Sequence, residues 1–260
     1  MKKIKMSALV LAAASIASTS VMAQSSDAQA WAGPFVQAKV GYASFSPTVG
    51  NGSLAFSGNS NLTIPPLGGT YNASASNLNT ATAAVDAGYN FAVDSKMTVG
   101  LGLTYYTGAT GTSNATLSPT LNVLGPGPQV NLNYQLKNLW AITIQPGYAI
   151  DKERLVYGKV GYTGVTIGAS GSSDPSTLGA GHAGSSVAYQ TVTLSGYTLG
   201  LGYKQAITNS LYWLGEVNYG GFSNKTATLA VNNNTVGNGT ATGNFGGSGV
   251  DFLVGIGYRF

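Results

Sequence analysis

The sequence predicts an all-β fold, an eight-stranded antiparallel transmembrane β-barrel with four long extracellular loops and short periplasmic turns. Three observations predict it. The 260 residues include only 12 basic and 8 acidic ones, whereas about a quarter of the residues of a soluble domain are charged. The chain has no apolar run of the roughly 18 residues that a membrane-spanning helix needs. Its apolar residues instead alternate with polar ones and with glycines, as in barrels whose strands face lipid on one side.

Residues 1–23 have the pattern of a secretory signal peptide for the Sec pathway. Three lysines within the first five residues precede a short apolar run, and Val21-Met22-Ala23 forms a small-residue cleavage site. We therefore expect a mature domain at 24–260, and loss of these lysines lowers the formal net charge from +4 to +1. A near-neutral chain gives no reason to expect a nucleic-acid partner. The sequence contains no Cys, which excludes disulfides and thiolate metal sites.

Eight segments with apolar residues at every second position are expected as strands. They cover 33–45, 80–91, 96–108, 130–150, 155–168, 188–204, 211–223 and 248–260. Long connections rich in Asn, Ser, Thr and Gly alternate strictly with short ones. The long ones are 46–79, 109–129, 169–187 and 224–247, and the short ones are 92–95, 151–154 and 205–210. Such alternation is typical of bacterial barrels, with tight periplasmic turns and long extracellular loops.

Side-chain parity predicts which face of each strand meets lipid, since successive side chains point to opposite faces. In the last strand the even positions from 250 to 260 are all apolar, whereas the odd positions include Asp251, Arg259 and two glycines. The strands at 96–108, 155–168 and 211–223 show the same split. The polar set is too rich in Gly for a solvated exterior. We therefore expect it to line a lumen that, in eight-stranded barrels, side chains fill.

Aromatic residues fall at the two ends of the expected strands, where interfacial girdles belong. At the short-turn end they are Tyr89, Phe91, Tyr148, Tyr203, Trp213, Tyr258 and Phe260, and at the long-loop end Tyr42, Phe45, Tyr105, Tyr219 and Phe252. A soluble β-sandwich with aromatic residues scattered through its core is the alternative.

Several sequence motifs recur in an order that is itself informative. LVYGKVGY at 155–162 follows QPGY at 145–148 and a short charged turn. LGY at 201–203, LYWLGEVNY at 211–219 and the terminal VGIGYRF at 254–260 continue the pattern. In these motifs the chain resembles small OmpA-like, opacity-type outer-membrane β-barrel proteins, and the likeness covers essentially the whole mature domain.

The resemblance implies an eight-stranded barrel in the outer membrane of a Gram-negative bacterium. It also implies that the terminal aromatic strand, with Tyr258 and Phe260, is the recognition signal for the barrel assembly machinery. Because the chain stops at that strand, the peptidoglycan-binding domain of longer OmpA-type proteins is not expected. The long segments between strands follow no pattern of the family.

A set of polar residues is expected to line the interior. By parity it comprises Lys39, Asp86, Gln145, Lys159, Glu216, Asp251 and Arg259, together with Gln37. Three of these side chains are positive and three are negative, and buried charges must be paired or hydrogen-bonded. We expect a self-neutralising network that plugs the barrel. A gated ion path, with a charge pair as its gate, is the alternative.

No catalytic, cofactor or metal site is expected. His182 is the only His, and no nearby acid could orient it for nucleophilic chemistry. One His without Cys cannot build a closed metal site. The Gly-x-Gly pairs at 100/102, 200/202 and 255/257 lack the helix that follows a dinucleotide fingerprint.

The expected function is therefore non-enzymatic, with an envelope-structural or surface-interaction (adhesin-like) role in the outer membrane. Outer-membrane lipid is the expected partner of the barrel. A host or other surface ligand is expected to bind the long loops, which are nearly free of charge, since loops on a rigid scaffold commonly carry function. A narrow, porin-like passive channel for ions or small solutes is the alternative.

Overall fold

The computed structural model describes residues 26–107, 111–173, 184–233 and 235–260. Within these ranges the chain forms one antiparallel sheet of 12 strands and two short 3-10 helices, η3 (Gln29–Trp31) and η4 (Ser60–Leu62). None of the helices in these ranges is long and apolar enough to cross a membrane. The expected signal peptide and His182 lie outside the described residues.

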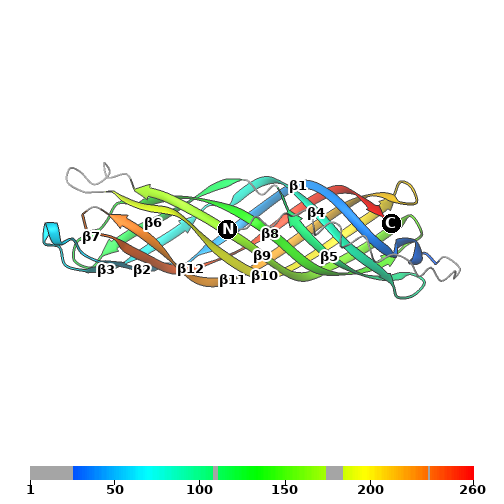
Figure 1. The fold of residues 1–260 in the computed structure, drawn as a ribbon, viewed down its shortest axis with the longest axis horizontal. Coiled ribbons are helices and arrows are strands. Elements are labelled where there is room, and N and C mark those ends of the chain that lie inside the picture. Colours follow the sequence, from blue (N-terminus) through cyan, green and yellow to red (C-terminus); the bar gives the residue numbers. More distant parts are fainter. Residues whose placement is uncertain (1–25, 108–110, 174–183, 234) are drawn as a thin grey trace, which may run out of the picture.

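The sheet closes on itself into a long barrel (Figure 1). Neighbouring strands follow the order β1-β4-β5-β8-β9-β10-β11-β12, and β1 pairs with β12. The strands are β1 (Gly33–Val49), β2 (Gly52–Phe56), β3 (Leu67–Ala75), β4 (Leu78–Ala92), β5 (Met97–Tyr106), β6 (Thr112–Leu121), β7 (Gly125–Pro126), β8 (Val130–Ala149), β9 (Arg154–Ser173), β10 (Ser185–Ala206), β11 (Leu211–Asn233) and β12 (Gly239–Arg259).

A second closed ring of pairings lies at the end far from the short turns. There β12 pairs with β2, β2 with β3, β3 with β6, and β6 with β8. β2 continues the line of β1 along β12, since Val49 pairs with Phe245 and Ser53 with Thr242. We call the ring that contains β2, β3 and β6 the distal barrel, and the ring that contains β1, β4 and β5 the proximal barrel. β8 to β12 run through both.

The count of strands and the long loops differ from the sequence-based prediction. Positions 46–79 and 109–129 contain β2, β3, β6 and β7, and 224–247 mostly extends β11 and β12. The physical reason is the composition of these strands. The large apolar residues of these strands, such as Leu54 and Leu229, lie on the inward face. The outward face consists mostly of Ser, Thr, Asn and small residues, which resembles loop composition. A structureless segment as long as 46–79 is also rare in a compact fold.

Between the two barrels, one-residue register shifts exchange the inward and outward faces of some strands. On β8 the even positions 130–136 point inward, but farther along the odd positions 141–149 do so. The shift lies between Lys137 and Trp140, where Asn138 has a φ of 49°. β11 has a similar shift between Phe222 and Lys225. A single extra residue in a strand exchanges its two faces, so the expected strand at 130–150 is continuous but inverted near Asn138.

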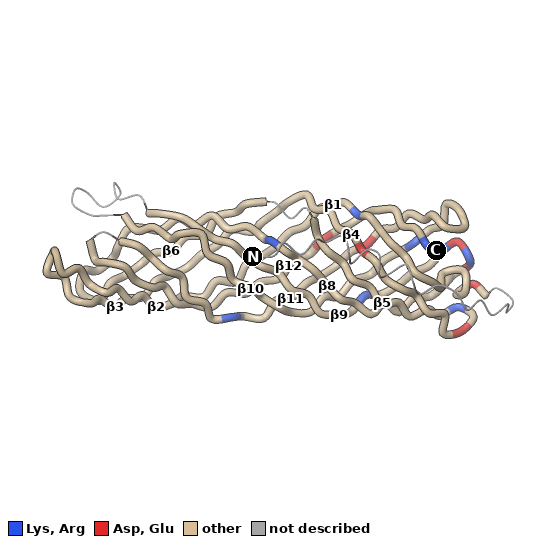
Figure 2. The backbone as a smooth tube through the Cα atoms, viewed as in Figure 1, with Lys and Arg blue, Asp and Glu red and all other residues tan. Residues whose placement is uncertain are grey.

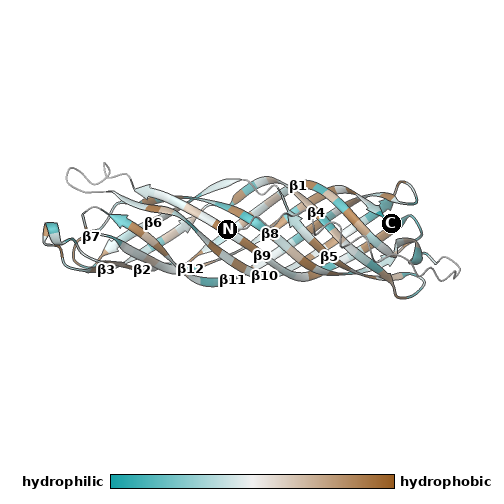
Figure 3. Cartoon of the chain, viewed as in Figure 1, coloured by the Kyte–Doolittle hydropathy of each residue, from teal (hydrophilic) through white to brown (hydrophobic). Residues whose placement is uncertain are grey.

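The proximal barrel has its apolar side chains outside, as parity predicts. Val254 is 46% exposed whereas its neighbour Leu253 is fully buried, and Figure 3 shows hydrophobic bands crossing this part of the wall. Phe45 was expected in the girdle at the long-loop end, and that assignment is wrong. It is buried because the odd positions of this part of β1 point inward, and it packs beside Leu78 and Val165.

Candidate functional site

Two lysines and two carboxylates meet inside the proximal barrel. Lys39 Nζ lies 3.0 Å from Asp86 Oδ2 and 2.9 Å from Glu216 Oε2. Lys159 Nζ lies 3.3 Å from the same Glu216 oxygen and 3.9 Å from the same Asp86 oxygen. The four residues come from β1, β4, β9 and β11, so the contacts join strands that are not all neighbours. We call these four residues the ion-pair network, and Figure 2 shows acidic and basic residues gathered in this part of the barrel.

Glycines on neighbouring strands make room for the ion-pair network. Gly255 pairs with Lys39 across β1 and β12, and Gly202 pairs with Glu216 across β10 and β11. A Cβ on Gly255 would lie 2.8 Å from Lys39 Cγ, and one on Gly202 would lie 2.3 Å from the Tyr157 ring. These distances are too short for real side chains. The Gly-x-Gly pairs are therefore strand positions that leave lumen space for long polar side chains.

Neutral side chains extend the network. Tyr157 Oη donates a hydrogen bond to Glu216 Oε1 at 2.5 Å. Asn218 Nδ2 and Tyr106 Oη donate to the two oxygens of Asp251 at 2.8 and 2.9 Å. Such partners are needed because burying an ion costs several kcal/mol in lost hydration. The four residues of the ion-pair network are two cations and two anions, so their formal charge is zero. Asp251 adds a further anion beside them.

The structure brings together only part of the predicted polar set. Gln145 Nε2 donates to Thr143 Oγ1 at 3.1 Å rather than to a carboxylate of the ion-pair network. Gln37 Nε2 donates to Tyr212 Oη at 3.0 Å. Arg259 lies at the short-turn end, where its Nε donates to the carbonyl of Asn209 at 2.7 Å.

Lys204 is an interior cation that the sequence analysis does not select. It is buried, and its Nζ lies 4.5 Å from the ring centre of Tyr157, 4.6 Å from that of Phe35 and 5.5 Å from that of Tyr212. Ring faces attract cations. Within the described ranges Lys204 forms no ion pair. Parity would have found it, because the even positions 198–204 share the inward face of β10.

The segment before β1 closes the short-turn end of the lumen. Trp31, in η3, is buried, and its Nε1 donates to the carbonyl of Asp151 at 3.3 Å. Its own carbonyl accepts from Asn90 Nδ2 at 3.1 Å. The Arg259 guanidinium lies 4.4 Å from the ring centre of Trp31, and the ring of Tyr212 meets it edge-on at 5.7 Å. Side chains therefore occupy the lumen from this end to the ion-pair network.

Comparisons with solved structures find similar architecture. The outer membrane protease OmpT from Escherichia coli aligns with a TM-score of 0.50 and 8% identity, over 93% of this chain and 100% of that one. The fold is that of an outer-membrane β-barrel. OprG from Pseudomonas aeruginosa aligns with a TM-score of 0.48 and 15% identity, over 88% and 96% of the two chains. Ail from Yersinia pestis aligns with a TM-score of 0.37 and 11% identity, over 88% of this chain and 99% of that one.

Sequence comparisons give no relative. No model of a known protein family matches the chain, and no curated protein is significantly similar to it. At 8–15% identity to the three structures named above, the likeness concerns the outer-membrane barrel fold alone.

The aromatic residues that are expected to form the girdle and the assembly signal lie at the outer surface of the proximal barrel, near its short-turn end. The rings of Tyr258 and Phe260 are 5.0 Å apart, and those of Tyr203 and Trp213 are 5.4 Å apart. Trp213, Tyr258 and Phe260 are exposed, and Tyr203 is partly buried.

A metal ion in the described part of the barrel would need several ligating side chains in one place. No group of three or more His, Cys, Asp or Glu side chains lies there in an arrangement that could hold a metal ion. Asp86 and Glu216 have side chains without solvent exposure and face lysines. In this geometry both carboxylates bind the ammonium groups of Lys39 and Lys159.

Proposed function

We propose that the protein is an integral outer-membrane protein with an envelope-structural or surface-interaction role and no enzymatic activity. In this proposal the proximal barrel spans the bilayer with eight strands, after export through the Sec pathway and loss of residues 1–23. One observation carries the proposal, namely a ring of strands with an apolar outer face around paired, buried charges. The outward apolar positions of β12 run from 250 to 258, close to the about 9–11 residues of a transmembrane strand.

The ion-pair network supports a barrel that is closed to ions. Lys39 contacts two carboxylates at 2.9 and 3.0 Å, and Trp31 and Tyr212 fill the lumen on the short-turn side. An ion that passed would have to separate buried charges from each other, which leaves unpaired charges in a medium of low polarity. A narrow passive channel is the competing function, because the same charges could act as its gate.

Conductance in planar bilayers tests these two functions. Refolded residues 24–260 should insert without large, stable openings. The double variant Lys39→Ala, Glu216→Ala removes one cation and one anion and should open the lumen to ions. The matched control Lys152→Ala, Glu153→Ala removes the same charges from an exposed turn and should stay closed. Large, stable openings of the unmodified chain would favour the channel.

The outer wall of the distal barrel supports a surface-interaction role. Its β2, β3, β6 and β7 carry no charged residue, and exposed hydroxyl and amide groups pair across strands, as in Thr228 with Thr242 at 2.9 Å and Thr226 with Asn244 at 2.8 Å. A ligand would therefore meet a polar β-surface rather than loops. Adhesion of expressing cells to laminin-coated and fibronectin-coated surfaces should fall on Thr228→Glu but not on Glu153→Ala.

The terminal strand is the proposed contact with the barrel assembly machinery. Phe260→Ser should reduce the amount of folded barrel in cells while spontaneous refolding into lipid vesicles proceeds normally. Phe252→Ser removes an exposed aromatic ring from β12 and serves as the control, since it should affect both routes equally. Equal effects of the two changes in both assays would contradict a signalling role for Phe260.

A further inference from the structure

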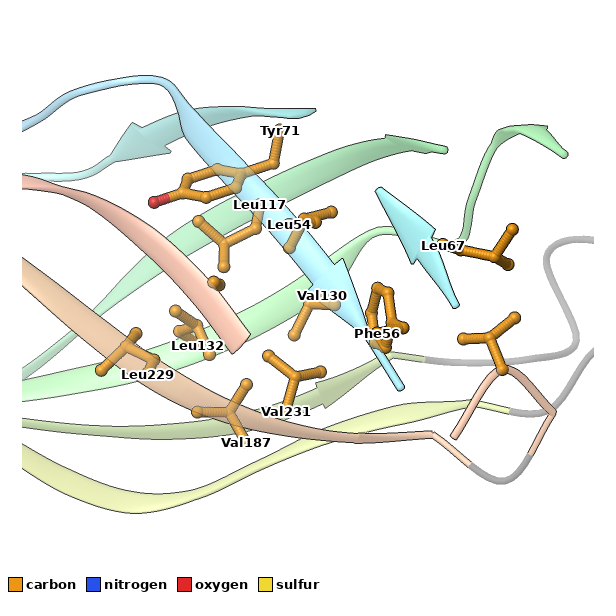
Figure 4. Close-up of a cluster of buried hydrophobic side chains, with 12 residues drawn as sticks. Leu54, Phe56, Leu67, Tyr71, Leu117, Val130, Leu132, Val187, Leu229 and Val231 are labelled. Atoms are coloured by element: carbon orange, nitrogen blue, oxygen red, sulfur yellow. The ribbon is translucent and has the colours of Figure 1, made fainter. Parts of the chain in front are cut away.

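The distal barrel encloses an apolar interior. Its inward side chains form one cluster of buried residues: Leu54, Phe56, Leu67, Tyr71, Leu117, Val130, Leu132, Val187, Leu229, Val231, Val236 and Ala241. Figure 4 shows labelled members of this cluster directed into a shared space from β2, β3, β6, β8, β10 and β11. The interior is thus of the opposite polarity to that of the proximal barrel, although the same long strands build both.

Side chains do not fill this interior completely. A cavity of about 300 Å³ lies within it, bordered on one side by Leu54, Phe56 and Leu117 and on another by Val231 and Ala241. Leu124 also borders the cavity and is 58% exposed, which places an opening at the distal rim. The cavity is therefore reachable from the aqueous side of the distal barrel.

From this geometry we propose that the distal cavity is a binding site for a small, uncharged, hydrocarbon-like molecule. This inference goes beyond the structural role proposed above. None of the described residues that border the cavity is charged, so a charged ligand would lose its hydration without compensation. Apolar cavities of about 150 Å³ stay dry and bind benzene. A site of twice that volume suits a molecule of one or two fused rings, or an aliphatic chain of similar size.

Four polar but uncharged side chains also border the cavity, namely those of Tyr71, Ser185, Asn233 and Thr235, and Asn233 Nδ2 already donates to Ser185 Oγ at 2.9 Å. Tyr71 borders the cavity and is buried, and burial raises the pKa of its phenol. The group is thus neutral at physiological pH and can give one hydrogen bond. Gly52 and Gly243 leave room for it, because a Cβ at either position would lie within 2.5 Å of the Tyr71 hydroxyl oxygen. The site therefore accepts a hydrocarbon, or a hydrocarbon with an uncharged, weakly polar group near these side chains.

Naphthalene is a suitable probe, with naphthalene-2-sulfonate as its charged counterpart. The full mature chain, labelled at Leu and Val methyl groups and held in lipid nanodiscs, is titrated with each compound and followed by NMR. Naphthalene should shift the methyl signals of Leu54, Leu117 and Val231 in a saturable way. The signals of Leu155, buried at the short-turn end, should stay in place, and the sulfonate should bind at least tenfold more weakly.

A pair of adjacent substitutions assigns the binding to the cavity. Ala241 is buried and borders the cavity, whereas Thr240 lies next to it on the outward face of β12. Ala241→Phe should weaken naphthalene binding at least tenfold, and Thr240→Phe should leave it unchanged. Both variants meet the same lipid and the same free probe concentration, so partition of naphthalene into lipid cancels in the ratio.

Three results decide the proposal. Absence of saturable shifts in the folded, unmodified chain would overturn it, as would equal weakening by Ala241→Phe and Thr240→Phe. If Ala241→Phe does not fold, it is replaced by Leu117→Ala, which enlarges the cavity. That variant should bind anthracene more tightly than the unmodified chain does, and an unchanged preference for ring size would also overturn the proposal. Membrane insertion is measured separately, so failure here leaves the proposed membrane role standing.

Discussion

The proximal and distal barrels share five long strands, β8 to β12, yet their polarity is reversed. The proximal barrel exposes Val254 and Leu201 and buries Lys39 and Glu216, whereas the distal barrel exposes Thr, Ser and Asn and buries residues such as Leu229. Backbone pairing is the same in both, because a closed ring satisfies the hydrogen bonds of every strand. Only the side-chain faces differ. The comparison shows that one β-barrel can have an apolar outer wall at one level and a polar outer wall at another.

The reversal is achieved partly by register and not only by composition. On β8 large apolar residues on both sides of the shift have even numbers, with Leu132 and Leu136 inside the distal barrel and Ile142 and Ile144 outside the proximal one. The extra residue at Asn138 exchanges the faces between them. On β12, by contrast, no shift occurs in its pairing with β1, and the apolar residues themselves change from even to odd numbers.

Deletion of Asn138 tests the register explanation and should have the largest effect. Without this residue, positions 130–136 of β8 would turn their apolar side chains outward. The free energy of burial lost would be about 1.5–3 kcal/mol for each large side chain. We expect the distal barrel to become susceptible to proteases while the proximal barrel stays folded. Asn138→Gly keeps the residue and its positive φ, and should be harmless. Intact protease protection after the deletion would show that the shift does not set the faces.

Removal of one member of the ion-pair network should have the second-largest effect, after deletion of Asn138. Glu216→Ala leaves Lys39 and Lys159 with fewer anions, and breaking a buried ion pair costs about 3–5 kcal/mol. Unfolding in urea from lipid vesicles should show a loss of this order. Glu153→Ala in an exposed turn should change stability little. Comparable losses in the two variants would mean that the buried charges contribute no more than surface ones.

An arginine on the outer wall distinguishes the two barrels directly. Val254→Arg, on the apolar outer face, should destabilise the inserted protein by about 2–4 kcal/mol if the site lies near the bilayer midplane. Thr240→Arg, on the outer face of the same strand in the distal barrel, should have almost no effect. If both variants showed equal and small effects on unfolding from vesicles, the outer wall at Val254 would not face lipid.

The smallest effect concerns the turn between β8 and β9. Arg154 donates hydrogen bonds to Asp151, the shorter at 2.5 Å, and these lower the pKa of the Asp151 carboxyl below its ordinary value. A lowered pKa in the folded state adds stability above the ordinary Asp pKa of about 3.9, and this is lost as the pH falls through the folded-state pKa. The pair is exposed, so the loss should be slight.

NMR titration of the Asp151 carboxyl measures this shift. Arg154→Ala should return its pKa towards the ordinary value, and Lys225→Ala, on a distant part of β11, should leave it unchanged. A carboxyl that titrates identically in all three proteins would show that the turn contributes nothing through this pair.

Strand parity explains what the sequence could predict about the fold. In the proximal barrel it separates Val254 from Leu253 and assigns Lys39 and Glu216 to the interior, because one face is strongly apolar and the other is rich in Gly. In the distal barrel the outward residues are Ser, Thr and Asn, whose composition is that of loops. Leu54 and Leu229 carry the alternation there, but too few apolar residues stand beside them for a strand to be distinguished from a loop.

The interior shows a further limit of parity, which gives the face of a residue but not its height in the barrel. Arg259 and Glu216 both point inward, yet one contacts Trp31 at the short-turn end and the other Lys39 deeper in the lumen. The height of a residue depends on strand tilt and register, which pair positions far apart in sequence. Strand parity would have placed Lys204 in the interior. It would not have predicted the contact of Lys204 with the ring of Phe35, which comes from another strand.

The two rings are joined unequally, and this has a mechanical consequence. β8 to β12 cross the junction as continuous strands, whereas β1 ends at Val49 before β2 starts at Gly52, and β3 ends at Ala75 before β4 starts at Leu78. A load applied at the distal rim would reach the proximal barrel directly through the continuous strands and less directly through the interrupted ones. The molecule should therefore be stiffer on one side, and it should bend towards the side of β2 and β3 when pulled or pushed at its tip.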